Sequence, residues 1–278
     1  MSESAKCIDE MQAQWAGDRP RDPKWREYLP HVRDNLFNLL TEVEFDKGDG
    51  SELKDSPTRT RPAKMRALAS SSALAVNFFD SWRDADKVAL SEALGLSAPI
   101  VELRFEFKTR DYPVRPRSPN LDVFLRLEDG RCVGVESKFS EPFRSDDGHG
   151  LLSARYFPSG RSLWNDAHME SAQRLAERMR PLWIHLDAPQ LLKHLLGLAN
   201  DPEKPSTLLY LWFDTGKQDS IAHRSEIDAF ASALAGDAIS FRSVTYQLTF
   251  AKLPAGTSPI NGWHTYMQSR YFQPSSAA

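Results

Sequence analysis

The sequence has little cysteine, no long apolar run and no excess of positive charge. Its 278 residues include only two cysteines, Cys7 and Cys132, which form no zinc motif and no disulfide framework. No apolar run approaches the roughly 20 residues of a membrane-spanning helix. The first residues, MSESAKCIDEM, lack the apolar core of a secretory signal. These absences predict a cytoplasmic protein with no membrane partner.

The net charge of −3 excludes a protein that coats nucleic acid by bulk charge. Contact with DNA or RNA would therefore need a local basic surface. The sequence shows no helix-turn-helix, no zinc finger and no internal repeat, so any sequence preference would come from loops. The 41% hydrophobic and 26% charged residues are typical of an ordinary globular domain.

The stretch PNLDVFLRLEDGRCVGVESKF at 119–139 predicts a β-hairpin with two unlike faces. A two-residue turn would pair Val123 with Glu136 and mix charge with the apolar face, a register that is strongly penalised. A three-residue loop ending in a left-handed Gly130 instead pairs Val123 with Val135 and Asp122 with Glu136. We expect this second register.

In that register two carboxylates lie side by side, with Lys138 close to the same point. Cross-strand Cβ atoms are roughly 5 Å apart, and two carboxylates at that distance repel unless a proton or a cation separates them. Two acids and a lysine suit Mg²⁺ and a phosphate, because Mg²⁺ prefers oxygen ligands and can polarise a phosphoryl oxygen. The alternative interpretation is the salt-bridged, exposed face of an ordinary hairpin.

Pro119-Asn120-Leu121-Asp122 followed by Glu136-Ser137-Lys138 resembles the signature of the PD-(D/E)xK nuclease superfamily, with the first motif stretched from P-D to P-N-L-D. Residues 70–77 and 136–142 also resemble a bacterial group of restriction endonuclease-like proteins. The resemblance implies that Asp122, Glu136 and the Ser137 backbone bind Mg²⁺, for which Mn²⁺ can substitute, and that Lys138 takes part in catalysis. The acid often found on the first helix is not evident. Candidates for an auxiliary role are Ser71, Asn77, Glu102 or Glu106, and Gln173.

Hydrophobic periodicity predicts helices at 32–45, 65–82, 84–96, 163–179, 188–199, 226–234 and 262–271. It predicts strands at 99–108, in the hairpin, at 206–214 and at 239–253. This order implies an α/β protein with a mixed sheet flanked by helices, the αβββαβ core of the resembled superfamily. We expect an N-terminal arm and helix at 1–62, a nuclease-like core at 63–214, and a helix-strand-helix extension of the same domain at 215–278.

Basic residues in three segments predict contact with nucleic acid, although a solvated surface is the default for such runs. They are Arg110, Arg115 and Arg117 in the proline-rich connector, Arg144 and Arg155 in the loop at 140–162, and the run at 59–66. We therefore expect a Mg²⁺-dependent endonuclease of restriction or defence type acting on DNA, with a homodimer as one option for its assembly. The alternatives are an inactive relative that binds nucleic acid or serves as a scaffold, and a carboxylate-pair hydrolase acting on sugars.

Overall fold

The fold is built around one five-stranded sheet. The computed structural model describes residues 1–38, 52–55, 61–110, 112–114, 119–144, 150–178 and 183–273. The strands follow the order of the chain: β1 (Ile100–Lys108), β2 (Asn120–Leu127), β3 (Cys132–Lys138), β4 (Pro205–Trp212) and β5 (Ser240–Thr245). The first three strands form an antiparallel meander, and β4 and β5 continue the sheet in parallel with β3. The predicted mixed sheet is confirmed.

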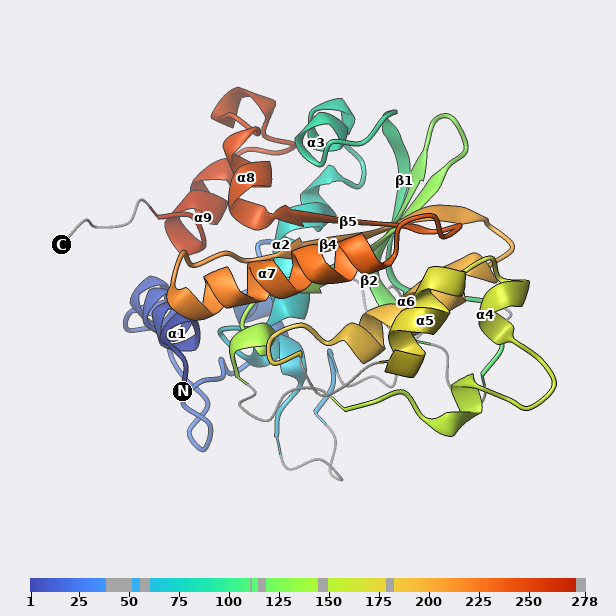
Figure 1. Ribbon diagram of the computed structural model, residues 1–278. Helices are drawn as coiled ribbons and strands as arrows, with labels where there is room; N and C mark the ends of the chain where they lie inside the picture. The colour runs from blue at the N-terminus through green and yellow to red at the C-terminus, as the bar shows by residue number, and fades with distance from the viewer. Residues whose placement is uncertain are drawn as a thin grey trace.

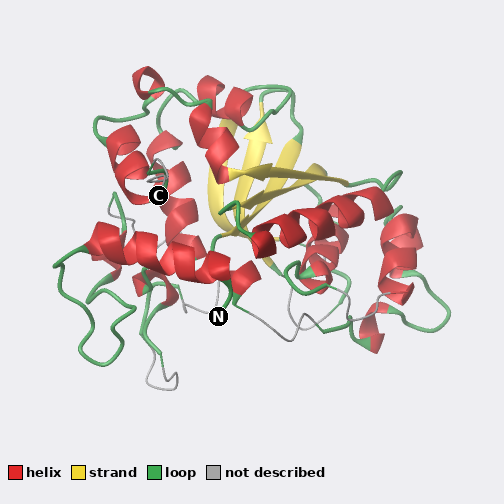
Figure 2. Ribbon diagram, turned by 60° about the vertical axis from the view of Figure 1, so that its left-hand side comes forward, coloured by secondary structure: helices red, strands yellow, loops and turns green. Residues whose placement is uncertain are grey.

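Helices cover both faces of this sheet. They are α1 (Glu3–Ala16), α2 (Ser71–Phe79), α3 (Val88–Ala93), α4 (Leu163–Asp166), α5 (Glu170–Arg178), α6 (Ala188–Ala199), α7 (Gln218–Ala233), α8 (Tyr246–Ala251) and α9 (Trp263–Arg270). Figure 1 shows α3, α8 and α9 on one side of the sheet and α5, α6 and α7 on the other. The sheet lies between these helices in the turned view of Figure 2. α2 belongs to the first group, since Phe78 packs edge-on against Tyr246 of α8 and Trp263 of α9.

The hairpin has the register that the alternation of its residues predicts. Val123 pairs with Val135 and Leu125 with Val133. The Leu127 N–H donates to the Arg131 carbonyl at 2.8 Å, and Gly130 has a φ of +82°. A left-handed glycine in a three-residue loop gives this pairing. The apolar residues of β2 and β3 therefore face one another in the core.

Several element boundaries differ from the predictions because side chains cap the helices. The predicted helix at 65–82 begins only at Ser71, since the Ser70 hydroxyl accepts a hydrogen bond from the Ala73 N–H at 3.2 Å. The predicted strand at 239–253 ends at Thr245, whose hydroxyl caps α8. The predicted helix at 163–179 is divided into α4 and α5 at His168, which has a φ of +55°. Serine and threonine near these positions mark helix starts rather than helix interiors.

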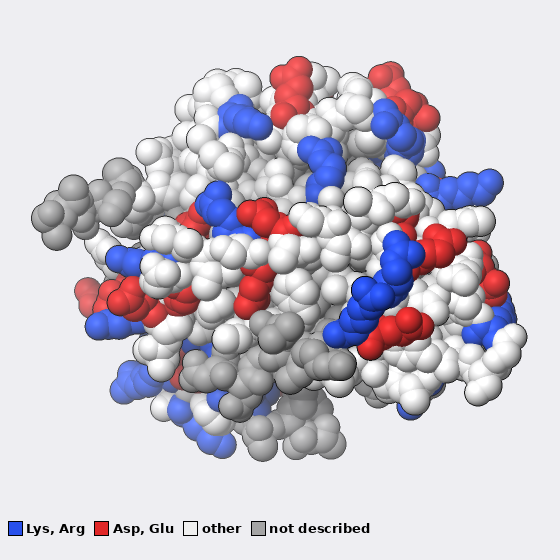
Figure 3. Space-filling model, viewed as in Figure 1, with Lys and Arg blue, Asp and Glu red and all other residues white. Residues whose placement is uncertain are grey.

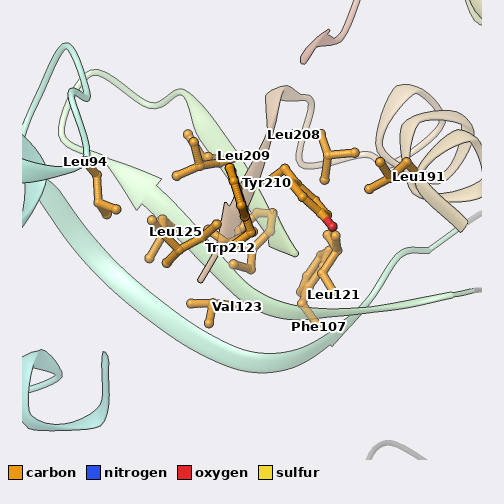
Figure 4. Packing of buried hydrophobic residues seen from close by; sticks show 14 of the residues in the cluster. Leu94, Phe107, Leu121, Val123, Leu125, Leu191, Leu208, Leu209, Tyr210 and Trp212 are labelled. Carbon is orange, nitrogen blue, oxygen red and sulfur yellow. The ribbon is translucent and has the colours of Figure 1, made fainter. Parts of the chain in front are cut away.

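The N-terminal region contains a helix that the sequence pattern did not reveal. α1 is capped by Ser2, buries Ala5 and Ile8, and packs against α7 and α9. Of the helix predicted at 32–45, residues Val32–Asn35 form a short 3₁₀ helix, and residues 39–45 lie outside the described ranges. Residues of all three predicted segments enter one hydrophobic cluster, from Ile8 through Val123 to Met267. Figure 4 shows its centre, where side chains of β2, β4 and α6 meet.

Gly134 of β3 lets α6 approach the sheet closely. An added Cβ at this position would lie 2.7 Å from Leu121 Cδ1 and 3.1 Å from Leu198 Cδ2, and both leucines are buried. We predict that Gly134→Ala lowers the free energy of unfolding by about 1–3 kcal/mol, because the added methyl group does not fit the packed core and the neighbouring side chains must shift. Urea unfolding measures this loss. Gly256→Ala is the matched control, since its Cβ would meet nothing within 4 Å. Equal stability of the two variants would contradict the close packing of α6 on β3.

Candidate active site

A pocket of about 1270 Å³ lies at the end of the sheet where β1 and β3 finish and β2 begins. Asp122, Glu136 and Lys138 all line it, so the hairpin brings the three predicted catalytic side chains to one place. Ser137 lines it as well, together with Ser70 at the start of α2 and Gln190 at the start of α6. The pocket is therefore built where both helical layers meet the open end of the hairpin.

Glu136 and Lys138 form a buried ion pair. Lys138 Nζ donates to Glu136 Oε1 at 2.8 Å and to Gln190 Oε1 at 3.0 Å. On the other side of the carboxylate, His194 Nε2 lies 3.1 Å from Glu136 Oε2, but the geometry does not make a hydrogen bond. Glu136 is only 2% exposed. The Glu136 carboxylate thus lies between one lysine and one histidine.

Asp122 has different surroundings from Glu136. Its Oδ2 accepts a hydrogen bond from the Ser137 N–H at 2.7 Å. Burial raises the pKa of Asp122 well above its usual value, and the neighbouring Glu136 raises it further. Burial also acts to raise the pKa of Glu136, but Lys138 and His194 outweigh it and lower that pKa. Of the two carboxyl groups, Asp122 is therefore the one that takes up a proton more readily.

The environment of Lys138 keeps its amine protonated. Burial alone would lower the pKa of this group, but Glu136, Glu141 and Asp122 together raise it above its ordinary value. A lysine held as an ammonium ion can donate hydrogen bonds and stabilise negative charge. It cannot remove a proton from water at neutral pH, so its chemistry is electrostatic.

Glu106 of β1 is a third carboxylate in the pocket. It stands opposite Asp122, since its neighbours Phe105 and Phe107 pair with Val123 and Leu121. It is 8% exposed, and its φ of +48° is strained for a glutamate. Strained backbone of this kind is concentrated at functional sites. The sequence offered Glu102 or Glu106 at this strand, and the structure places Glu106 in the pocket.

The other auxiliary candidates divide into one that lines the pocket and three that do not. Ser71 lines it and donates a hydrogen bond to Glu141. Asn77 is buried in the core, where it donates to the Tyr271 hydroxyl at 3.0 Å. Glu102 pairs with Arg126 at 2.9 Å, and Gln173 accepts from the Ser162 hydroxyl at 2.7 Å. Asn77, Glu102 and Gln173 therefore lie outside the pocket lining, and Gln190, which was not a candidate, lines it.

Of the basic residues predicted to contact nucleic acid, only some line the pocket. Arg144 lines the pocket, where it pairs with Asp9 of α1. Arg110 pairs with Glu203 at 2.7 Å outside the pocket lining, and Arg155 does not line the pocket either. Arg115 and Arg117 lie outside the described residues. Of the remaining pocket-lining cations, Arg61 and Lys64 belong to the basic run predicted at 59–66, and Lys108 ends the strand that leads into the proline-rich connector. Arg21 and Arg26 were not foreseen.

Within the described ranges, no three or more His, Cys, Asp and Glu side chains are grouped so that they could hold a metal ion. None of the described helices has the length and apolar character needed to cross a membrane. Figure 3 shows basic and acidic side chains interspersed over the face that carries α7, without a large area of one sign.

The mixed sheet, with an acidic pair and a lysine at the end of its hairpin, defines a restriction-endonuclease-like fold of the PD-(D/E)xK type. A family model described as "Restriction Endonuclease associating with ARP" matches residues 8–272. The chain belongs to this family. A search of curated proteins and a search of solved structures each found no match.

Glu106 gives the protein a specific dependence of stability on pH. Burial, followed by repulsion from Glu52, raises the pKa of Glu106 from 4.5 to about 7. The folded state then binds more protons than the unfolded state between these values, so stability falls as the pH rises through this range. At ~1.4 kcal/mol per pKa unit, this single group accounts for a loss of up to about 3 kcal/mol.

We therefore predict that Glu106→Gln, which cannot ionise, becomes more stable relative to the wild type as the pH rises from 5 to 8. Urea unfolding in EDTA at several pH values measures the difference. Glu102→Gln on the same strand serves as the control, because Glu102 pairs with Arg126 outside the pocket. Parallel pH profiles for the wild type and Glu106→Gln would contradict the burial of an ionisable Glu106.

Proposed function

We propose that this protein is a Mg²⁺-dependent endonuclease that hydrolyses phosphodiester bonds in DNA. The observation that carries the proposal is the meeting of Asp122, Glu136 and Lys138 in one open pocket at the end of the hairpin. Membership of a family of restriction endonucleases supports nuclease chemistry and favours DNA over RNA as the substrate.

The residues present fit a hard divalent cation. Glu106, Asp122 and Glu136 place three carboxylates along one wall of strand ends in the pocket, and Lys138 is paired with Glu136 alone. Mg²⁺ takes oxygen ligands and usually needs only one or two protein carboxylates. Asp122 and Glu136 would hold it, with the Ser137 backbone carbonyl as a third ligand. When bound, Mg²⁺ polarises a phosphoryl oxygen and lowers the pKa of water.

Lys138 would act on the phosphate as a fixed ammonium group. Gln190 and Glu136 hold its Nζ at 3.0 and 2.8 Å, so the amine is oriented before substrate binds. A donor fixed in advance stabilises the negative charge that develops during phosphoryl transfer. The protonated state of Lys138 makes it a donor to the scissile phosphate or to the attacking water rather than a base.

The nucleic acid would run along the basic side of the pocket. Arg21, Arg26, Arg61 and Lys64 line the pocket together with Lys108, although the net charge of the chain is −3. Lysine and arginine contacts to phosphates supply most of the affinity of such interfaces. Arg21 and Arg26 of the N-terminal region would therefore be phosphate contacts, beside the acidic residues Asp9, Glu27 and Glu52 that line the same pocket.

Replacement of the central residues should abolish cleavage without unfolding the chain. We predict that Lys138→Ala and Asp122→Ala each reduce the rate of DNA cleavage in Mg²⁺ by roughly 10²-fold or more, because each removes electrostatic stabilisation of the reacting phosphate. Gln173→Ala, outside the pocket, should cut at the wild-type rate. Cleavage of a plasmid followed on gels, with EDTA as a blank, measures these rates.

A wild type that binds DNA but never cuts it in Mg²⁺ or Mn²⁺ would favour the inactive, nucleic-acid-binding alternative. Undiminished cleavage by both alanine variants would show that the catalytic residues lie elsewhere. Cleavage that persists in EDTA would remove the metal from the proposal.

The basic side of the pocket is tested by binding alone. We predict that Arg26→Ala weakens binding to DNA of any sequence and lowers the slope of log K against log salt by ~0.9, as expected for one lost phosphate contact. Fluorescence anisotropy in EDTA at several salt concentrations measures both. Arg110→Ala is the matched control, since Arg110 pairs with Glu203 outside the pocket lining. A reduced slope for Arg110→Ala and an unchanged one for Arg26→Ala would reverse this assignment.

A further inference from the structure

His194 is a buried histidine whose polar environment is unusual. It is 0% exposed, and neither of its ring nitrogens makes a hydrogen bond with any described residue. The closest acidic atom is Glu136 Oε2, 3.1 Å from His194 Nε2, and that oxygen is itself buried without a hydrogen bond. Burying polar atoms in this way costs free energy unless they form hydrogen bonds with one another.

The position of His194 on α6 connects it to the pocket. Gln190 and His194 are one helical turn apart and so lie on the same side of α6. Gln190 accepts a hydrogen bond from Lys138, and His194 approaches Glu136. The helix start is fixed by Asp187, which accepts from the Gln190 N–H at 2.9 Å. Side chains on one face of α6 therefore lie next to both Glu136 and Lys138.

The two oxygens of Glu136 face different surroundings. Oε1 binds Lys138, and Lys138 and Gln190 both line the pocket. Oε2 faces His194, which does not line the pocket. A cation entering from the pocket would meet Glu136 on the Oε1 side. The histidine lies behind the carboxylate, where it can fix the direction of that oxygen without contact with substrate.

We propose that His194 is a positioning residue, whose Nε2–H holds Glu136 Oε2 so that Oε1 points into the pocket as a cation ligand. The inference rests on the proposed metal-dependent function. Groups that orient a metal-binding side chain typically change metal affinity 10- to 100-fold when they are removed. A histidine that only fills space in the core would have no such effect.

The test is calorimetric titration of the wild-type protein and its variants with Mn²⁺ alone. We expect His194→Leu, which fills similar space without a donor, to weaken Mn²⁺ binding at least tenfold. His194→Gln, whose amide can place a donor near the position of Nε2, should recover affinity to within a few fold of the wild type. His223→Leu is the matched control. His223 is also 0% exposed, but it lies 3.0 Å from the Tyr210 hydroxyl instead of Glu136.

The outcomes separate the two proposals. Wild-type Mn²⁺ affinity in His194→Leu, or equal weakening in the leucine and glutamine variants, overturns the positioning role and leaves the metal centre standing. A wild type that binds no Mn²⁺ removes the metal centre and the positioning role together. Should His194→Leu fail to fold, nitrogen NMR of the wild-type ring decides the matter. A proton on Nε2 supports the proposal, and a neutral ring protonated only on Nδ1 overturns it.

Discussion

Asp122 and Glu136 are two carboxyl groups held side by side at the end of a hairpin, where both line the pocket and the Lys138 ammonium pairs with Glu136. Moving a charged group out of water costs several kcal/mol, which only close opposite charges and hydrogen bonds can offset. Lys138 offsets this cost for Glu136, whereas Asp122 has the Ser137 N–H and an elevated pKa. Asp122 is therefore the less compensated of the two carboxyl groups, and a divalent cation would favour its ionised form.

The remainder of the fold fixes the positions of these groups. The left-handed Gly130 sets the register of the hairpin and so brings Asp122 to the level of Glu136. Gly134 leaves room for Leu198, which lets α6 lie close to β3 and brings Gln190 to Lys138. The parallel pairing of β3 with β4 places the hairpin at the centre of the sheet, so that both helical layers support it. Neutral, close-packed residues thus determine where the charged ones meet.

The sequence predicts the hairpin and its three polar side chains because strict alternation leaves only one register with an apolar face. It does not decide between Glu102 and Glu106, because both lie on the charged side of one alternating strand and only the tertiary fold brings Glu106 to the pocket. Gln190 could not be told from Gln173, since only the packing of α6 on the sheet brings Gln190 near Lys138. Arg21 and Arg26 belong to a polar segment without periodicity, and only the tertiary fold carries them to the pocket. Local patterns predict pairing between strands, whereas contacts across the chain require the packed structure.

The central claim is that Asp122 and Glu136 together bind a divalent cation. Anomalous diffraction from crystals grown with saturating Mn²⁺ tests it most directly. The account predicts a manganese peak bonded to both carboxylates, with Lys138 released from Glu136 Oε1 and still beside Gln190. A pocket without a peak, in which Lys138 remains bound to Glu136, would contradict it.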